Sequence, residues 1–280
     1  MIILLSKKMG FCLGVKKSIE LANKTIKNKN TMIYMYGPII HNPRIIKDYQ
    51  KKGVKIINDF SKIPDGSTVI TRAHGISPAR CMEAKNRKIN LIDTTCPNVK
   101  KLQKIATYLY EKQYFIIIYG DKNHPEISSV MEMVNHHALI VNQTAEIIDI
   151  NQKKKIGIIS QTTKNMHDFK KMASFLVDKT KELRIFNTIC PATMERQESV
   201  YDLSKNVDVM VIIGGKNSAN TSRLAEICKN QGVKTYHVEE KNQLKRDWFS
   251  KNDRVGIGSG ASTPDYLTKE IIQQLKEWYL

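Results

Sequence analysis

Short apolar runs alternate with polar loops and longer amphipathic stretches along the 280-residue chain. The clearest runs, rich in β-branched and aromatic residues, span residues 114–119, 156–159 and 207–213. Each is followed by a loop of Gly, Ser, Thr or Asn and then by a helix-like pattern, which is typical of buried parallel strands in α/β units. Residues 1–5 read as a further strand. The pattern predicts an α/β fold with mainly parallel sheets.

A repeated spacing divides this pattern into three modules. Each module begins at a cysteine, the first station, and carries a polar residue four places after a glycine, the second station. The first stations are Cys12, Cys96 and Cys190, and the second stations are His41, His124 and Ser218. A third station follows at residues 71–74, 160–163 and 259–262, and it contains His74, Thr162 and Ser262. We therefore expect three similar domains, residues 1–95, 96–189 and 190–280.

The stations fall at the strand ends where α/β folds usually carry their functional side chains. In open parallel sheets, ligands gather at the carboxyl ends of the strands, where loops lead into helix N-termini that favour anions. Three modules facing a common centre would bring three thiolates and several His, Ser, Thr and Asn side chains into one pocket.

Composition favours a packed enzyme without a membrane anchor. The chain is 41% hydrophobic, yet no segment approaches the roughly 18 to 20 apolar residues of a membrane span. The first eight residues have too short an apolar run for a secretory signal. We expect no membrane insertion and a cytoplasmic protein of bacterial type, although a trimmed plastid-type enzyme would look identical.

The formal net charge of +18 comes mainly from scattered lysines. Scattered lysine usually forms a solvated surface, whereas phosphate and nucleic-acid sites draw on the bidentate fork of arginine. A nucleic-acid-binding module is the alternative that charge alone suggests, but the sequence has no basic face with stacking aromatics. The basic surface could instead steer an anionic substrate or an acidic electron donor.

The five cysteines point to metal chemistry rather than to disulfides. An odd number of cysteines in a chain without an export signal does not indicate a disulfide framework. Cys81 and Cys228 lie in helix-like stretches outside the repeat, so we interpret them as ordinary thiols. Structural zinc sites usually use close cysteine pairs, which this chain lacks. Three widely spaced thiolates would leave one iron of a [4Fe–4S] cluster without a protein ligand, an arrangement suited to catalysis.

Ten short motifs, in order along nearly the whole chain, resemble the 4-hydroxy-3-methylbut-2-enyl diphosphate reductase family. They are residues 11–15 (FCLGV), 37–42 (GPIIHN), 72–75 (RAHG), 93–97 (DTTCP), 124–126 (HPE), 160–163 (SQTT), Cys190, 196–198 (RQE), 216–218 (KNS) and 260–265 (GASTPD).

The resemblance implies three similar α/β domains in a pseudo-threefold arrangement around one [4Fe–4S] cluster. Cys12, Cys96 and Cys190 would be its ligands, and the fourth iron would be open. The implied substrate is an allylic alcohol diphosphate, which loses its hydroxyl by two-electron reduction and yields isopentenyl or dimethylallyl diphosphate. The implied electron donor is flavodoxin or ferredoxin with its reductase.

The resemblance also assigns roles to side chains. Breaking a C–OH bond needs a proton on the leaving oxygen, and Glu126 would supply it, with Thr162 orienting the substrate alcohol and His124 beside them. The substrate-binding set would be His41, His74, His124, Thr162, Ser218, Asn220 and Ser262.

One departure from the family pattern is visible. Where the family usually has Ser-Ser-Asn, this chain has Ser218-Ala219-Asn220, so one hydroxyl is missing. A contact at Ala219 would have to come from its backbone N–H, or from Thr221 instead. A different three-cysteine cluster enzyme, such as a quinolinate synthase, is the other alternative, and the motifs at residues 161–163 and 216–218 argue against it.

Overall fold

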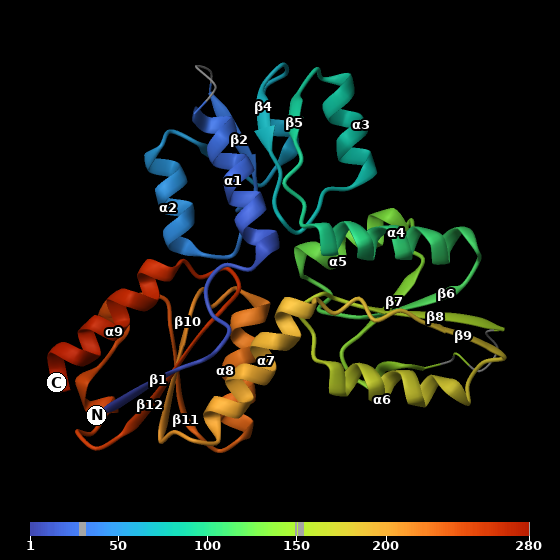
Figure 1. Cartoon of the computed structure of the whole chain (residues 1–280). Helices are drawn as coiled ribbons and strands as arrows, with labels where there is room; N and C mark the ends of the chain where they lie inside the picture. The colour runs from blue at the N-terminus through green and yellow to red at the C-terminus, as the bar shows by residue number, and fades with distance from the viewer. Residues whose placement is uncertain (28–31, 149, 151–153, 280) are drawn as a thin grey trace. The chain divides into compact units, whose positions relative to one another are not determined.

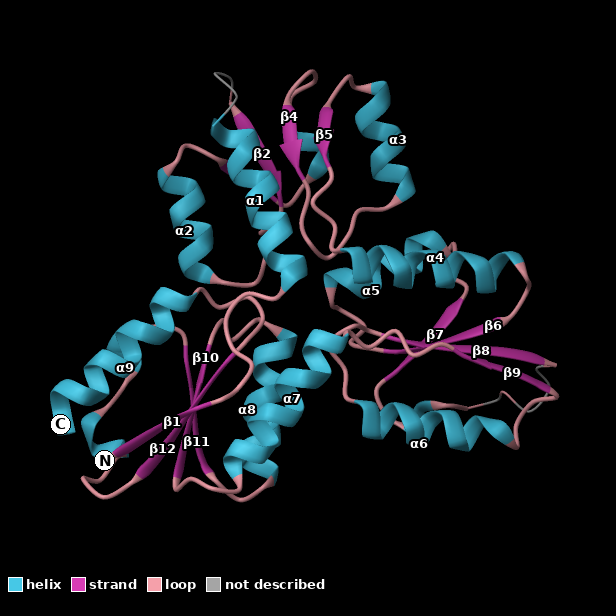
Figure 2. Cartoon of the chain, in the orientation of Figure 1, coloured by secondary structure: helices cyan, strands magenta, loops and turns pink. Residues whose placement is uncertain are grey.

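The computed structural model describes residues 1–27, 32–148, 150 and 154–279. The chain divides into two compact units. The first comprises residues 1–16, 40–48 and 191–280, and the second comprises residues 17–39 and 49–190. Both consist of helices packed on parallel sheets (Figures 1 and 2). No helix among the described residues is long and apolar enough to cross a membrane.

The first unit contains sheet A, in which every strand pairing is parallel. Its strands, in spatial order, are β1 (Ile2–Leu5), β12 (Arg254–Ser259), β10 (Val209–Ile213) and β11 (Lys234–Val238). The accompanying helices are α7 (Pro191–Ser204), α8 (Ala219–Asn230) and α9 (Asp265–Tyr279). Because β1 pairs with β12, this sheet uses the first and the last strands of the chain.

The second unit contains two further parallel sheets. Sheet B has the order β3 (Lys55–Ile57), β2 (Ile33–Tyr36), β4 (Thr68–Ile70) and β5 (Asn90–Ile92). Sheet C has the order β7 (Ala138–Val141), β6 (Phe115–Tyr119), β8 (Lys155–Ser160) and β9 (Glu182–Ile185). The helices that precede or connect these strands along the chain are α1 (Leu13–Lys27), α2 (Pro43–Lys51), α3 (Pro78–Asn86), α4 (Pro97–Glu111), α5 (Pro125–Met133) and α6 (Met166–Val177).

One strand order is used three times, which confirms the expected α/β fold with repeated parallel sheets. Sheets B and C run β3-β2-β4-β5 and β7-β6-β8-β9, and sheet A repeats this order as β11-β10-β12-β1. In each sheet the chain passes from a central strand, β2, β6 or β10, to the strand on one side of it and then to the strand on the other side. The strand order therefore reverses, at a topological switch point, between β2 and β4, between β6 and β8, and between β10 and β12. The second and third stations follow these strands directly. The division of the chain at its cysteines, after residues 95 and 189, stays a proposal.

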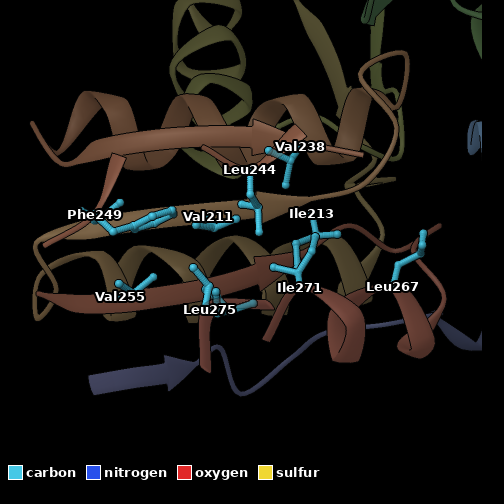
Figure 3. Close-up of a cluster of buried hydrophobic side chains, with 11 residues drawn as sticks. Val211, Ile213, Val238, Leu244, Phe249, Val255, Leu267, Ile271 and Leu275 are labelled. Atoms are coloured by element: carbon cyan, nitrogen blue, oxygen red, sulfur yellow. The ribbon is translucent and has the colours of Figure 1, made fainter. Parts of the chain in front are cut away.

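Strand β10 shows why the sheets are covered on both faces. All five of its residues are apolar and buried. Val211 and Ile213 belong to a cluster with Ile271 and Leu275 of α9 (Figure 3). The intervening Met210 and Ile212 pack instead with residues of α7 and α8. Successive side chains of a strand point to opposite faces, so a continuous apolar run is what a sheet between two helical layers requires.

Candidate active site

The three repeated cysteines each stand at the start of a helix. Cys12 directly precedes α1, Cys96 is the N-cap of α4 and Cys190 directly precedes α7. The backbone N–H of Val15, in the first turn of α1, points to the Cys12 sulfur at 3.4 Å. Unpaired N–H groups and the helix dipole favour anions there.

The other two cysteines have different surroundings. Cys81 lies within α3, and Cys228 lies buried within α8. Burial raises the pKa of both thiols, that of Cys228 to about 12. All five cysteines are free. The interpretation of Cys81 and Cys228 as ordinary thiols therefore agrees with their positions in the fold.

A backbone hydrogen bond fixes each repeated cysteine beside a third station. In every case the cysteine N–H donates to a backbone carbonyl oxygen of a third-station loop. For Cys96 and Cys190 that loop comes earlier in the chain, and for Cys12 it is the loop of the last module. The three bonds are Cys12 to Ala261 at 3.2 Å, Cys96 to Ala73 at 3.0 Å and Cys190 to Thr162 at 2.9 Å. The first lies in the first unit and the other two lie in the second.

Glu126 and Thr162 form a buried pair in the second unit. Glu126 is the second residue of α5, after β6, and Thr162 follows β8 at the adjoining strand end. The Thr162 backbone N–H donates to Oε1 of Glu126 at 2.7 Å, and its hydroxyl lies 2.7 Å from Oε2. Glu126 is only 2% exposed and Thr162 only 6%. The sequence expected these two residues to act together, and the switch point of sheet C brings them together.

Burial makes the carboxyl of Glu126 a weaker acid than usual. Loss of hydration raises the pKa of its carboxyl from 4.5 to about 7, the two hydrogen bonds from Thr162 oppose the rise, and Asp121 adds to it. A hydroxyl can donate or accept, so Thr162 can pair with Glu126 in either protonation state. Near neutral pH the pair can therefore hold a proton or release it.

Two histidines lie beside this pair. His124 is the N-cap of α5, and its Nδ1 accepts the backbone N–H of Glu126 at 3.2 Å. The His74 ring meets the His124 ring edge to face, with centroids 5.4 Å apart. The Ser129 hydroxyl of α5 donates to the His74 carbonyl at 3.3 Å, which ties the end of sheet B to α5. An accepting Nδ1 leaves Nε2 to carry the proton of neutral His124, so that nitrogen is a donor.

The first unit presents neutral donors at the equivalent strand ends of sheet A. Ser218 is the N-cap of α8, where its Oγ accepts the Thr221 N–H at 3.4 Å. The Ser262 hydroxyl lies 3.4 Å from that Oγ and donates to the His41 carbonyl at 3.5 Å. Ser218, Ser262 and Asn220 are all buried. The structure thus gathers three of the expected binding residues, and the backbone of His41, at one switch point.

Asn220 is a buried polar side chain with unused hydrogen-bonding capacity. Its side chain is 4% exposed, and neither amide atom has a hydrogen-bond partner among the residues that the structure describes. A buried amide without partners costs about 1 to 3 kcal/mol, which a bound ligand could recover. The amide lies in the first turn of α8, where N–H groups and the dipole favour negative charge.

Close backbone contact holds the His41 segment against sheet A. A Cβ atom on Gly215 would lie 2.4 Å from the His41 carbonyl oxygen, so only glycine fits there. The Asn42 amide donates to the Ser262 carbonyl at 3.0 Å, and its oxygen accepts N–H groups in the first turn of α2. Asn42 lies in one of the family motifs, but nothing in that motif predicts this supporting role.

Arg196 is a second supporting residue to which the sequence assigned no role. Its guanidinium is buried in the first unit and donates to the carbonyls of Gly10 at 2.9 Å and Ala192 at 2.8 Å. It thereby holds the loop that leads to Cys12. The bond to Gly10, 186 residues away, could have been predicted only with knowledge of the packing.

The cysteine surroundings fit an anionic iron–sulfur cofactor. Three free thiols, each half-buried at a helix N-terminus, suit the thiolate ligands that such clusters require. Cys81 and Cys228, with raised thiol pKa values inside helices, do not.

Comparison with known proteins gives one consistent family. The model of the LytB protein family matches residues 3–276. Relatives named 4-hydroxy-3-methylbut-2-enyl diphosphate reductase include one from Campylobacter hominis, 43% identical over 97% of both chains. Another, from Caldanaerobacter subterraneus, is 42% identical over 98% of this chain and 96% of the relative.

Solved structures agree. A structure described as (E)-4-hydroxy-3-methyl-but-2-enyl diphosphate reductase, the terminal enzyme of the non-mevalonate pathway, is 37% identical and covers 99% of this chain and 100% of its own, with a TM-score of 0.73. The E-1-hydroxy-2-methyl-but-2-enyl-4-diphosphate reductase of Plasmodium falciparum is 30% identical and covers 98% of this chain and 88% of its own, with a TM-score of 0.92.

Proposed function

The chain belongs to the LytB family, and from this premise we propose that it reduces 4-hydroxy-3-methylbut-2-enyl diphosphate to isopentenyl and dimethylallyl diphosphate, the last step of the non-mevalonate pathway. The reaction takes two electrons and two protons, breaks the C–OH bond and releases water. The observation that supports the proposal is the buried Glu126–Thr162 pair, because a carboxyl of pKa about 7 can donate a proton to a leaving oxygen near neutral pH.

Cys12, Cys96 and Cys190 are proposed to hold one [4Fe–4S] cluster, which, when bound with three thiolate ligands, would supply electrons one at a time and an open iron that acts as a Lewis acid. The helix N-termini behind the cysteines would lower the cost of placing an anionic cofactor there.

The residues around Glu126 are proposed to manage the proton. Glu126 carries it when neutral, and Thr162 keeps the carboxyl in place and can pass a hydrogen bond to the substrate alcohol. His124 fixes the start of α5 and offers its Nε2 to the substrate.

The diphosphate is proposed to bind serine, asparagine and histidine side chains rather than lysines. Its oxygens would accept from the side chains of Ser218 and Asn220 at the start of α8, from Ser262 after β12, and from His41, His74 and His124. The amide of Asn220, which has no partner among the described residues, supports this assignment, since a phosphate oxygen could accept from its N–H group.

The proposed electron donor is flavodoxin or ferredoxin with its reductase, and the proposed location is the cytoplasm. The net charge of +18 would attract an acidic donor protein. Five free cysteines suit a reducing compartment.

The test is to measure iron, acid-labile sulfide and dithionite-driven turnover on anaerobically purified protein. We expect about four iron and four sulfide per chain, and loss of turnover in Cys96→Ser. Cys81→Ser is the matched control and should keep both cluster and activity. Stoichiometric zinc, or no metal and no turnover after anaerobic reconstitution with iron and sulfide, would contradict the proposal.

A further inference from the structure

Asn98 lies next to two of the proposed cluster ligands, Cys96 and Cys190. It is the second residue of α4, two places after Cys96, and Pro97 occupies the first helical position. Its side-chain Nδ2 donates to the sulfur of Cys190 at 3.1 Å. One residue is therefore joined by a short helix start to one cysteine and by a hydrogen bond to the other. All three residues lie in the second unit.

The backbone around this contact is fixed on both sides. The N–H of Cys96 donates to Ala73 and that of Cys190 to Thr162, so neither cysteine can move freely away from the amide. Proline at the first helical position presets the backbone from which Asn98 projects. The bond can therefore persist as a defined N–H···S contact, although Asn98 itself is exposed to solvent.

We propose that Asn98 is a positioning residue that raises the reduction potential of the iron–sulfur cluster through its hydrogen bond to Cys190. The inference rests on the proposed function, because it needs Cys190 to be a ligand. An N–H donor to a ligand sulfur stabilises the more negative, reduced cluster more than the oxidised one. The cluster then accepts electrons more readily from a donor of given potential.

The experiment compares variants by redox titration monitored by electron paramagnetic resonance, with iron and sulfide measured on the same samples. Asn98→Leu removes the donor, and Asn98→Asp replaces it with a nearly isosteric acceptor that carries negative charge. We expect Leu to disfavour reduction about three- to tenfold, which is about 30 to 60 mV at 59 mV per tenfold for a one-electron couple. Asp should lower the potential further. Asn86→Leu, the same change at an exposed site in α3, should leave the potential unchanged.

The outcomes separate this inference from the proposed function. A wild-type protein that holds no iron–sulfur cluster would defeat the proposed function itself. A fully loaded Asn98→Leu protein with the wild-type potential would overturn only the role of Asn98, and a change in thermal stability without a change in potential would show a purely structural contact. If Asn98→Leu loses iron, the near-isosteric Asn98→Asp decides, and an Asp potential equal to or above wild type overturns the inference.

Discussion

The first turns of α5 and α8 occupy the same place in sheets C and A but present different chemistry. Both helices follow the central strand of a sheet, β6 or β10, and both are capped by the side chain at the second station, His124 or Ser218. The residue two places after the cap is Glu126 in α5 and Asn220 in α8. Each is buried, but Glu126 has two bonds from Thr162, whereas the Asn220 amide has no partner among the described residues.

The difference shows that a buried residue two places after a helix N-cap can have either of two chemical properties. A buried carboxyl at a helix start becomes a group that titrates near neutral pH, because burial outweighs the hydrogen bonds that stabilise its ionised form. A buried amide at the same place stays neutral and is available to a polar ligand. Under the proposed function, proton transfer and anion binding would use equivalent positions in different sheets.

The strongest way to break the comparison is Glu126→Gln, which makes the start of α5 resemble that of α8. Turnover should fall about 10²- to 10⁴-fold, because a general acid is lost, with little change in KM. Glutamine can keep both contacts to Thr162, so the fold should persist. Steady-state kinetics with dithionite as reductant measure the effect. Turnover within a factor of three of wild type would show that the proton comes from elsewhere.

The same variant should be more stable than wild type at high pH. The pKa of Glu126 is higher in the folded protein, about 7, than the ordinary value of 4.5. The folded state therefore binds the proton more tightly, and stability falls as pH rises from about 4.5 to about 7. The loss is at most about 3 kcal/mol. Glutamine removes it, so thermal melts should show the gain at pH 8 and none near pH 4.

A pH profile sharpens the comparison with a smaller effect. Above about pH 7 Glu126 becomes ionised and cannot donate, so wild-type turnover should decrease about tenfold per pH unit. Ser218→Ala, at the neutral site, should raise KM but keep the decrease of turnover above pH 7, whereas Glu126→Gln should abolish that decrease. The proposed roles would be reversed if the pH of this decrease shifted in Ser218→Ala and stayed unchanged in Glu126→Gln.

The smallest expected effect concerns Ala219, where the family resemblance expects a serine. Ala219→Ser adds a hydroxyl in the first turn of α8, and one more hydrogen bond of about 0.5 to 1 kcal/mol should lower KM about two- to fivefold. Turnover should not change. Ala79→Ser, at an exposed position near the start of α3, is the matched control. An unchanged KM would mean that the backbone N–H or Thr221 already supplies that contact.

The sequence predicted what local pattern and spacing determine. The apolar run at residues 207–213 became β10 (Val209–Ile213), and the stations fell at strand ends because turn residues and helix starts follow buried strands. Local pattern could not predict contacts made after folding. Arg196 binds the Gly10 carbonyl from a distant segment, and Asn98 reaches a sulfur 92 residues away. The raised pKa of Glu126 depends on complete burial, which the sequence does not show.

The pairing of β1 with β12 has a consequence for how the chain is made. Residues 2–5 leave the ribosome before the other strands of the three sheets, whereas their partner strand, residues 254–259, leaves after them. Sheets B and C can form while synthesis continues, whereas sheet A must wait and then close a very long loop, a slow kind of step in folding. The backbone N–H of Cys12 can donate to the Ala261 carbonyl only at that stage. The backbone contact of Cys12 can therefore form only after residue 261 has been synthesised, so a chain truncated before that residue should lack it.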